Sequence, residues 1–214
     1  MDLQKMWPPF GLSITARDDE HEITLRVLRD EDICAIHGVT PEEIYGPDVP
    51  VYAFPWLFAA PSPAFRWAHR AEFGPEKWSL DLGVFYRNQI IGVVDMRAED
   101  FKNARAIETG SWLYHREQGK GLGTLVRHAV AGFAFRYLEA TSLHTSWVEG
   151  NAASERVSAK VGYTVTGEST EPSGPQKQPM PTKTARLDRD SYQPGARVVA
   201  TGLTFELRTM LGVQ

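Results

Sequence analysis

The chain has 214 residues, of which 42% are hydrophobic and 23% are charged, and its formal net charge is −4. This composition supports a packed core and excludes an intrinsically disordered chain. The acidic balance argues against a nucleic-acid-binding protein, because such proteins usually carry a basic face.

The single cysteine, Cys34, cannot form a disulfide within the chain, which is typical of a reducing compartment. No apolar stretch approaches the length of a membrane-spanning helix, and the first residues lack the apolar core of a signal peptide. We therefore expect a cytoplasmic protein that does not enter a membrane. We also expect no metal site, because the six histidines are scattered and one cysteine cannot build a zinc cluster.

The N-terminal part of the chain mixes strand-like and irregular patterns. Residues 1–20 form a lead-in that contains prolines and a glycine. Residues 22–28 alternate apolar and charged side chains, which is the period of a half-buried strand. Acidic residues then open a short helix, where the helix dipole favours them. A loop rich in proline and aromatic residues spans 41–62, and a helix follows around 62–73.

Three strand-like runs come next, over residues 78–86, 90–97 and 106–114. The clearest helix of the chain covers residues 121–138. Its apolar residues fall three and four positions apart, so they lie on one stripe of the helix. A further strand is predicted over residues 142–148.

The C-terminal part begins with a helix over residues 151–161 that ends at Gly162, a usual residue at a helix C-terminus. A strand starts there. Residues 168–200 carry several prolines between polar side chains, which predicts a long polar loop. Residues 203–207 then form the last strand. This order predicts one domain over residues 1–214, with a mixed α/β sheet flanked by helices.

A glycine-rich turn before the clearest helix is the most informative segment. Gly119, Gly121 and Gly123 stand at alternate positions, and Lys120 adds a cation. Glycine lets the backbone approach a bulky anion, and the first N–H groups of a helix are unpaired and carry partial positive charge. The turn therefore predicts a phosphate site. The alternative is a turn that only lets the helix pack on the strand.

Two nucleotide-binding motifs do not fit this turn. A Walker loop requires G-x-x-x-x-G-K-[ST], and the sequence contains no such string. A dinucleotide fingerprint requires G-x-G-x-x-G; Gly119 and Gly121 fit, but Thr124 stands where the last glycine belongs. The turn thus excludes a nucleotide-dependent kinase or dehydrogenase.

The pattern Gln118-x-x-Gly121-x-Gly123 resembles the acyl-CoA pyrophosphate loop, Q/R-x-x-G-x-G/A, of the GNAT superfamily of N-acetyltransferases. The run Glu-Thr-Gly-Ser-Trp-Leu at 108–113 is similar to the fourth strand of its RimJ/RimL-like ribosomal-protein acetyltransferase branch. Asn151-x-x-Ser154 and the residues after it are similar to that branch's N-x-x-S…V-x-x-K-x-G-F/Y signature. The resemblance covers about 22–167 and departs over 168–200. It implies a GNAT-like fold with a central, mostly antiparallel, V-splayed sheet.

The resemblance implies direct transfer of an acyl group from coenzyme A to an amine. Acetyl-CoA would be the donor, or another acyl-CoA such as succinyl-CoA. Asn151 also has the commoner alternative role of a helix cap. The implied cofactor contacts come from the fourth strand, the glycine turn and the next helix: Trp112, Leu113, Gln118, Gly119, Lys120, Gly121, Leu122, Gly123, Thr124, Asn151 and Ser154.

Amine acylation requires a deprotonated amine, a polarised carbonyl and a stabilised leaving thiolate. The resemblance assigns the protonation of the thiolate to Ser154, with an ordinary first-turn helix serine as the alternative. Glu108 is the candidate base, provided that burial raises its pKa. A surface strand residue is the alternative for Glu108, and Asp95, His115 and His144 compete for the role of base.

The acceptor is left open between a protein N-terminal amine, a lysine and a small amine. The resemblance also leaves room for a homo-oligomer. The alternative to an enzyme is a non-catalytic acyl-CoA sensor with the same fold. Such a sensor would bind coenzyme A without transferring an acyl group.

Overall fold

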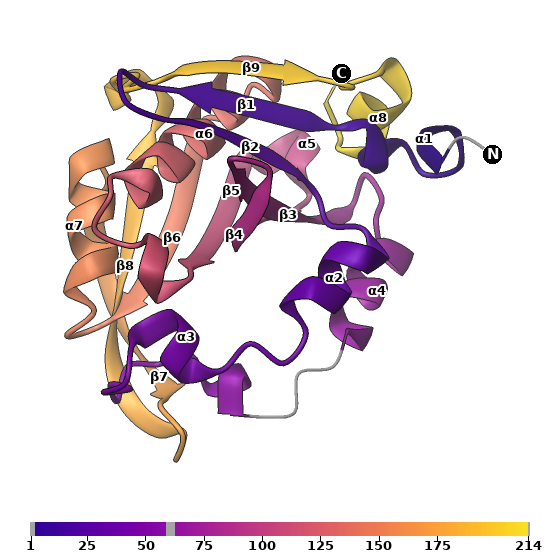
Figure 1. The fold of residues 1–214 in the computed structure, drawn as a ribbon. Helices are drawn as coiled ribbons and strands as arrows, with labels where there is room; N and C mark the ends of the chain where they lie inside the picture. Colours follow the sequence, from indigo (N-terminus) through magenta and orange to yellow (C-terminus); the bar gives the residue numbers. More distant parts are fainter. Residues whose placement is uncertain (1–2, 59–62, 214) are drawn as a thin grey trace.

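The computed structural model describes residues 3–58 and 63–213. In this part of the chain, one nine-stranded sheet has the strand order β7-β8-β6-β5-β4-β3-β2-β1-β9 (Figure 1). The strands are β1 (Ser13–Arg17), β2 (Glu22–Val27), β3 (Lys77–Tyr86), β4 (Gln89–Glu99), β5 (Ala106–Leu113), β6 (Ser142–Val148), β7 (Thr164–Ser173), β8 (Gln178–Asp188) and β9 (Arg197–Thr201).

Helices lie on both faces of the sheet. The α-helices are α1 (Leu3–Met6), α2 (Asp30–Ile36), α3 (Pro41–Tyr45), α4 (Ala64–Ala71), α5 (Phe101–Ala104), α6 (Leu122–Tyr137), α7 (Ala152–Val161) and α8 (Phe205–Met210). The short 3-10 helices are η1 (Pro8–Gly11), η2 (Pro55–Phe58), η3 (His115–Glu117) and η4 (Arg189–Ser191).

Neighbouring strands run antiparallel throughout this sheet except for β5 and β6, which are parallel. The parallel pairing covers Ala106 to Glu108 on β5 and Ser142 to His144 on β6. Both strands continue beyond these pairs without pairing to each other within the described residues, so they diverge. The predicted mixed α/β fold, with a mostly antiparallel sheet splayed into a V and flanked by helices, is confirmed.

Two hydrophobic clusters lie on opposite faces of the sheet. The larger one surrounds α6, whose Leu125, Ala129 and Phe133 are fully buried, as their spacing along the helix predicts. The smaller one joins α2 and α3 to Val93 of β4 and Trp112 of β5. Figure 1 shows α2 beside α4, and α3 apart from them near β7.

The long polar loop predicted over 168–200 is wrong. Strands β7 and β8 form an antiparallel hairpin there, and β9 follows it. Most of β7 is exposed, so its side chains show no apolar alternation. Its Pro172 lies on an edge strand, while Pro179 and Pro181 precede Thr182, the first residue of β8 that pairs with β6. Proline is tolerated at such positions because no ladder hydrogen bond is lost.

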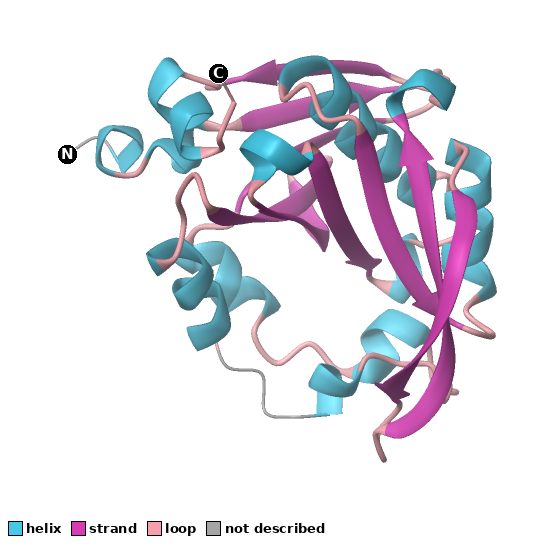
Figure 2. Cartoon of the chain, turned by 180° about the vertical axis from the view of Figure 1, so that it is seen from behind, coloured by secondary structure: helices cyan, strands magenta, loops and turns pink. Residues whose placement is uncertain are grey.

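The tip of the β7–β8 hairpin packs against the segment between α3 and η2. Figure 2 shows it extending past the rest of the sheet toward the short helices that follow α2. At its tip, Gly174 N–H donates to Ala53 O at 2.9 Å, and the Ser173 hydroxyl donates to Val51 O at 3.1 Å. The hairpin therefore holds the segment between α3 and η2 in place.

The strand predicted over residues 203–207 is also wrong. Gly202 has a φ of 75°, which ends β9 at Thr201. Thr204 then caps α8, because its hydroxyl accepts the Leu207 N–H at 3.2 Å. A threonine cap followed by the buried Leu207 favours a helix over a strand.

Two segments predicted to be irregular contain regular structure. The lead-in of residues 1–20 includes α1, η1 and the strand β1, although residues 1 and 2 lie outside the described part. The loop of residues 41–62 begins with α3, whose Thr40 and Glu43 form a capping box, and it includes η2. Residues 59–62 lie outside the described part.

Candidate active site

The divergence of β5 from β6 leaves peptide groups of β5 without a partner strand. Tyr114 N–H donates to Ile91 O at 2.9 Å, so the even-numbered positions along β5 turn their peptide groups toward β4. By alternation, Ser111 and Leu113 turn theirs toward the side that β6 has left. Trp112 packs its side chain in the smaller cluster and directs its backbone to β4. The geometry therefore favours Ser111 and Leu113 over Trp112 as the residues that offer backbone hydrogen bonds.

The glycine turn lies directly beyond this end of β5. Gly119 and Gly121 have φ angles of 76° and 83°, in the left-handed region that favours glycine. A Cβ atom added at either residue would meet nothing within 4 Å. Gly121 is the N-cap of α6 and supplies no side-chain cap. The turn thus presents the start of a sixteen-residue helix to open space, which suits a phosphate group.

Gln118 has a supporting position in the turn. Its Nε2 donates to Leu113 O at 2.9 Å and to Ile44 O at 2.7 Å. The side chain therefore ties the turn to the end of β5 and to α3. Lys120, in contrast, is half exposed and pairs with Glu117 at 2.9 Å.

The remaining residues of the turn connect it to α7. Leu122 is fully buried in the larger cluster, so only its backbone faces the turn. Thr124 is half-buried in the first turn of α6. A Cβ atom at Gly123 would lie 3.6 Å from Val157 Cγ2, which places the start of α6 beside the middle of α7, one turn after Ser154.

Asn151 and Ser154 form the start of α7. Asn151 Oδ1 accepts the Ser154 N–H at 3.1 Å, so Asn151 is the helix N-cap. Ser154 is half-buried, and its hydroxyl has no hydrogen-bond partner among the described residues. This hydroxyl is free to donate to a ligand bound between the two helix starts.

We expect Asn151→Ala to lower the free energy of unfolding by about 1 kcal/mol, the usual cost of losing a helix cap. Asn151→Ser retains an oxygen acceptor and should lose a smaller amount. Chemical denaturation of both variants measures the difference. Equal stability of Asn151→Ala and the unmodified protein would show that the cap does not contribute.

Glu108 lies on the opposite face from α6, in the open. Its side chain is 72% exposed, and its carboxylate lies 3.9 Å from Arg97 Nη2. Glu108 is therefore not buried, and the surface alternative describes its position.

Asp95 lies deeper on the same face and pairs with Gly110 across β4 and β5. Its side chain is 30% exposed, and Arg97 Nε is 3.1 Å from its Oδ2. A Cβ atom at Gly110 would lie 2.9 Å from Asp95 Oδ1, so the glycine makes room for the carboxylate. Burial raises the pKa of Asp95, although the Arg97 guanidinium opposes this change.

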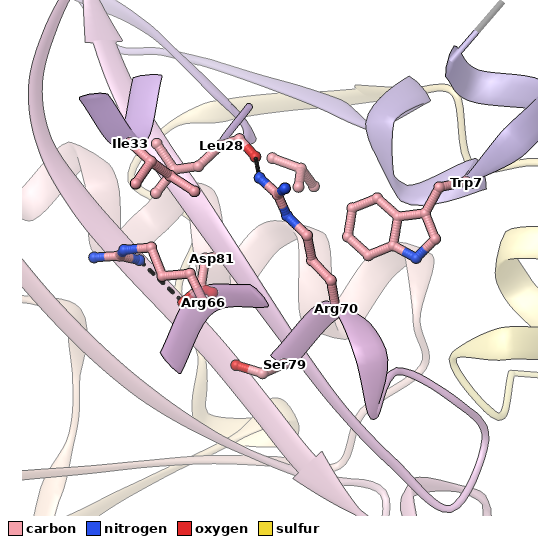
Figure 3. A pocket seen from close by; sticks show the side chains of 8 residues that line it. Trp7, Leu28, Ile33, Arg66, Arg70, Ser79 and Asp81 are labelled. Atoms are coloured by element: carbon pink, nitrogen blue, oxygen red, sulfur yellow. Dashed lines mark hydrogen bonds and ion pairs between the residues drawn. The ribbon is translucent and has the colours of Figure 1, made fainter. Parts of the chain in front are cut away.

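A third carboxylate, Asp81 of β3, pairs with Asp95 across the sheet. Arg66 Nη1 lies 3.2 Å from its Oδ1, and His69 Nδ1 lies 3.0 Å from its Oδ2. Figure 3 shows Arg66 directed at Asp81 beside a small pocket. The pocket has room for about one water molecule, so it is far smaller than usual ligand sites. No sequence pattern indicated this cluster.

Two histidines complete the residues expected from the sequence. His144 lies next to Glu108 at the last parallel pair, and its Nε2 is 3.1 Å from Ser142 Oγ. Burial and the nearby Arg186 lower the pKa of His144. His115 is exposed and packs near Gly46, away from the carboxylates of the sheet face.

Among the described residues, no three His, Cys, Asp or Glu side chains gather to hold a metal ion. In the same part of the chain, no helix has both the length and the apolar character that a membrane crossing requires.

The acetyltransferase (GNAT) domain family matches residues 22–164. The chain belongs to this family. YdaF of Bacillus subtilis (strain 168), which is named as a ribosomal N-acetyltransferase, is 26% identical over 116 residues. That match spans 50% of this chain and 62% of YdaF, less than two thirds of the relative's length.

Solved structures of this family share the fold. RimJ of Mycobacterium smegmatis, in complex with a CoA-disulfide, aligns with a TM-score of 0.65 and 17% identity over 86% of this chain and 89% of that one. RimL, a ribosomal L7/L12 alpha-N-protein acetyltransferase solved with coenzyme A, aligns with a TM-score of 0.66 and 16% identity over 83% and 99%. A Vibrio cholerae spermidine N-acetyltransferase with CoA and spermine aligns with a TM-score of 0.62 and 16% identity. The alignment covers 79% of this chain and 97% of that one.

Proposed function

We propose that this GNAT-family chain is a coenzyme A-dependent N-acetyltransferase. The observation that carries the proposal is a juxtaposition: the unpaired end of β5 leads straight into an open glycine turn at the start of α6. The turn would hold the pyrophosphate. The pantetheine arm would lie along β5, where β6 has separated from it. The proposed cofactor residues are those of the turn, together with Leu113, Asn151 and Ser154, and Ser111 joins them.

The chemistry assigned to this site is direct transfer. The N–H of Ser111 or Leu113 would polarise the thioester carbonyl, because a preorganised backbone donor stabilises the oxyanion that forms there. Ser154 would donate a hydrogen bond or a proton to the leaving thiolate. A carboxylate on the opposite face, Glu108 or Asp95, would take the proton of the amine.

We propose acetyl-CoA rather than succinyl-CoA as the donor. A succinyl group would require a free cation near the acyl end. The arginines on and beside the sheet face opposite α6, here called the acceptor face, are occupied. Arg97 Nε lies 3.1 Å from Asp95 Oδ2. Arg66 pairs with Asp81 at 3.2 Å, and Arg70 pairs with Asp30 at 2.6 Å.

For the acceptor, we propose an amine that is cationic in solution. The sheet face carries Asp81, Asp95 and Glu108, and acidic side chains attract such a group. The similar proteins are named for ribosomal proteins and for spermidine, so a protein N-terminus and a polyamine are both suitable probes. We further propose a cytoplasmic location, where coenzyme A thioesters and the single reduced cysteine are both expected.

Release of free thiol from acetyl-CoA tests the proposal, with spermidine and a peptide bearing a free α-amino group as acceptors. Acetylation of either, confirmed by mass spectrometry, supports the transferase. Binding of acetyl-CoA without any transfer would favour the acyl-CoA sensor instead.

Ser154→Ala is expected to slow turnover by roughly tenfold to a hundredfold while the dissociation constant of coenzyme A changes less than about threefold. The hydroxyl has no structural partner to lose, so stability should be unaffected. Ser154→Thr keeps the hydroxyl and serves as the control. Full turnover of Ser154→Ala would remove this residue from the mechanism.

A further inference from the structure

The face of the sheet opposite α6 carries three carboxylates in a graded arrangement. Glu108 is 72% exposed, Asp95 is 30% exposed and Asp81 is 10% exposed. The pairs Asp81–Asp95 and Asp95–Gly110 place them on one face, on three neighbouring strands. The series leads from the open surface at β5 to the buried side of α4.

Asp95 is the carboxylate nearest to the proposed reaction. It lies against Gly110, where a Cβ atom would come within 2.9 Å of its Oδ1. The next residue, Ser111, directs its peptide group to the side that the thioester would occupy, and consecutive strand residues are roughly 3.3 Å apart. An amine attacking a carbonyl bound there would therefore approach beside Gly110, the residue against which Asp95 lies.

We infer that Asp95 is the general base for the acceptor amine, and that Asp81 and His69 pass its proton to solvent. This inference rests on the proposed acetyl transfer and names the group that makes it possible. Glu108 then has a different task, which is to attract the cationic acceptor at the surface.

Burial distinguishes Asp95 from Glu108. A carboxylate becomes a better base when burial raises its pKa, and Asp95 has this property while it stays accessible from the open face. Arg97 limits the effect from 3.1 Å. The other charged or titratable groups around Asp95 come from four elements: Arg66 and His69 of α4, Asp81 of β3, Glu108 of β5 and Arg127 of α6.

The exit path runs from Asp95 through its cross-strand neighbour Asp81 to His69. Cross-strand partners such as Asp95 and Asp81 have Cβ atoms roughly 5 Å apart, so their carboxylates are within reach of one another or of a bridging water. Asp81 then contacts His69 Nδ1 at 3.0 Å, and the imidazole is 31% exposed. Imidazole is the side chain that ordinarily exchanges protons near neutral pH. Arg66 fixes the Asp81 carboxylate from the other side at 3.2 Å.

The protons balance in this scheme. The acceptor ammonium gives one proton to Asp95, and that proton leaves through Asp81 and His69. The neutral amine attacks the thioester carbon, and a C–N bond replaces the C–S bond. The second proton of the nitrogen ends on the thiolate, with Ser154 beside it. The products are the amide, coenzyme A and one proton in solvent.

The test compares Asp95→Asn, Glu108→Gln and His69→Gln in acetyl transfer to spermidine across pH. Asp95→Asn is expected to lower kcat by roughly a hundredfold or more and to remove the acidic limb of the rate profile, with acetyl-CoA affinity unchanged. The limb arises because the base must be deprotonated to act. It should lie above the pH at which an ordinary aspartate titrates, near 3.9, because burial raises the pKa of Asp95. Glu108→Gln should mainly raise the KM for the acceptor and keep the limb.

His69→Gln should lower the rate several-fold, and imidazole in the buffer should restore it. His144→Gln, beside Glu108 but outside the path, should match the unmodified protein. A weakly basic arylamine, which is already neutral at pH 7, should be acetylated nearly as well by Asp95→Asn. Normal transfer to spermidine by Asp95→Asn, or loss of the acidic limb in Glu108→Gln instead, would overturn the inference.

Failure of the proposed function has a different signature, since the unmodified protein would then neither bind nor consume acetyl-CoA.

One measurement of the role of Asp95 needs no acceptor. A carbon NMR titration of the carboxyl groups should show Asp95 titrating above the ordinary aspartate range, and a lower value would contradict its role as base.

Discussion

Gly121→Asp is expected to weaken coenzyme A binding strongly. The glycine has a φ of 83°, and a side chain added there would point into open space at the start of α6. A carboxylate in that position would stand where the pyrophosphate is proposed. Two unit charges about 4 Å apart repel by about 4 kcal/mol near a protein surface, so the affinity should fall by a factor on the order of a hundred or more.

Gly38→Asp is the matched control for this variant. Gly38 has a φ of 81°, and a Cβ atom there also meets nothing within 4 Å. Both variants should therefore lose about 1 kcal/mol of stability from the left-handed backbone. Only Gly121→Asp should lose coenzyme A affinity in a calorimetric titration. Equal affinities in the two variants would show that the turn does not hold the phosphates.

Arg127→Ala is expected to lower the free energy of unfolding by about 3 kcal/mol. The side chain is only 4% exposed; it donates to Thr109 Oγ1 at 2.7 Å and to Thr145 Oγ1 at 3.1 Å. These threonines follow the last parallel pair of β5 and β6, so Arg127 ties α6 to the point where the strands diverge. The variant loses two hydrogen bonds of a charged donor and leaves a cavity.

Coenzyme A affinity should also fall in Arg127→Ala, by roughly tenfold, because the divergent strands lose a common support. Arg136→Ala is the control on the same helix, since its side chain is exposed and its loss should change stability by less than about 0.5 kcal/mol. Denaturant unfolding of both proteins measures the difference. Similar stabilities would mean that the buried guanidinium costs as much as its hydrogen bonds contribute.

The sequence predicted well where one local pattern decides the structure. The strand over 22–28 and the helix over 121–138 have apolar residues at the period of their element, and both formed close to the predicted bounds. The glycine turn has the same local character. Its residues are neighbours in the chain, so a short motif was sufficient to place them together at the start of a helix.

The β7–β8 hairpin escaped prediction because its stability does not come from an apolar face. Most of β7 is exposed, and prolines occur in both strands. The hairpin joins the sheet because β8 also pairs with β6, and these two strands are far apart in the sequence. The local composition does not predict such a pairing.

The carboxylates of the sheet face opposite α6 could not be predicted from local sequence either. Asp81 and Asp95 are brought together by strand pairing, and Arg66 joins them from a separate helix. Likewise, the choice of Ser111 over Trp112 depends on the register between β4 and β5. Sequence patterns identified Glu108 through a resemblance, but burial in the folded chain is what distinguishes it from Asp95.

Calorimetric titration of the purified protein with coenzyme A, acetyl-CoA and succinyl-CoA decides whether the chain binds an acyl-CoA. We expect coenzyme A and acetyl-CoA to bind with dissociation constants on the order of micromolar, and succinyl-CoA to bind more weakly, since the arginines of α4 are already paired. Absence of binding by all three would mean that the glycine turn only lets α6 pack against the sheet, and it would contradict the assignment of this chain as an acyl-CoA-dependent transferase.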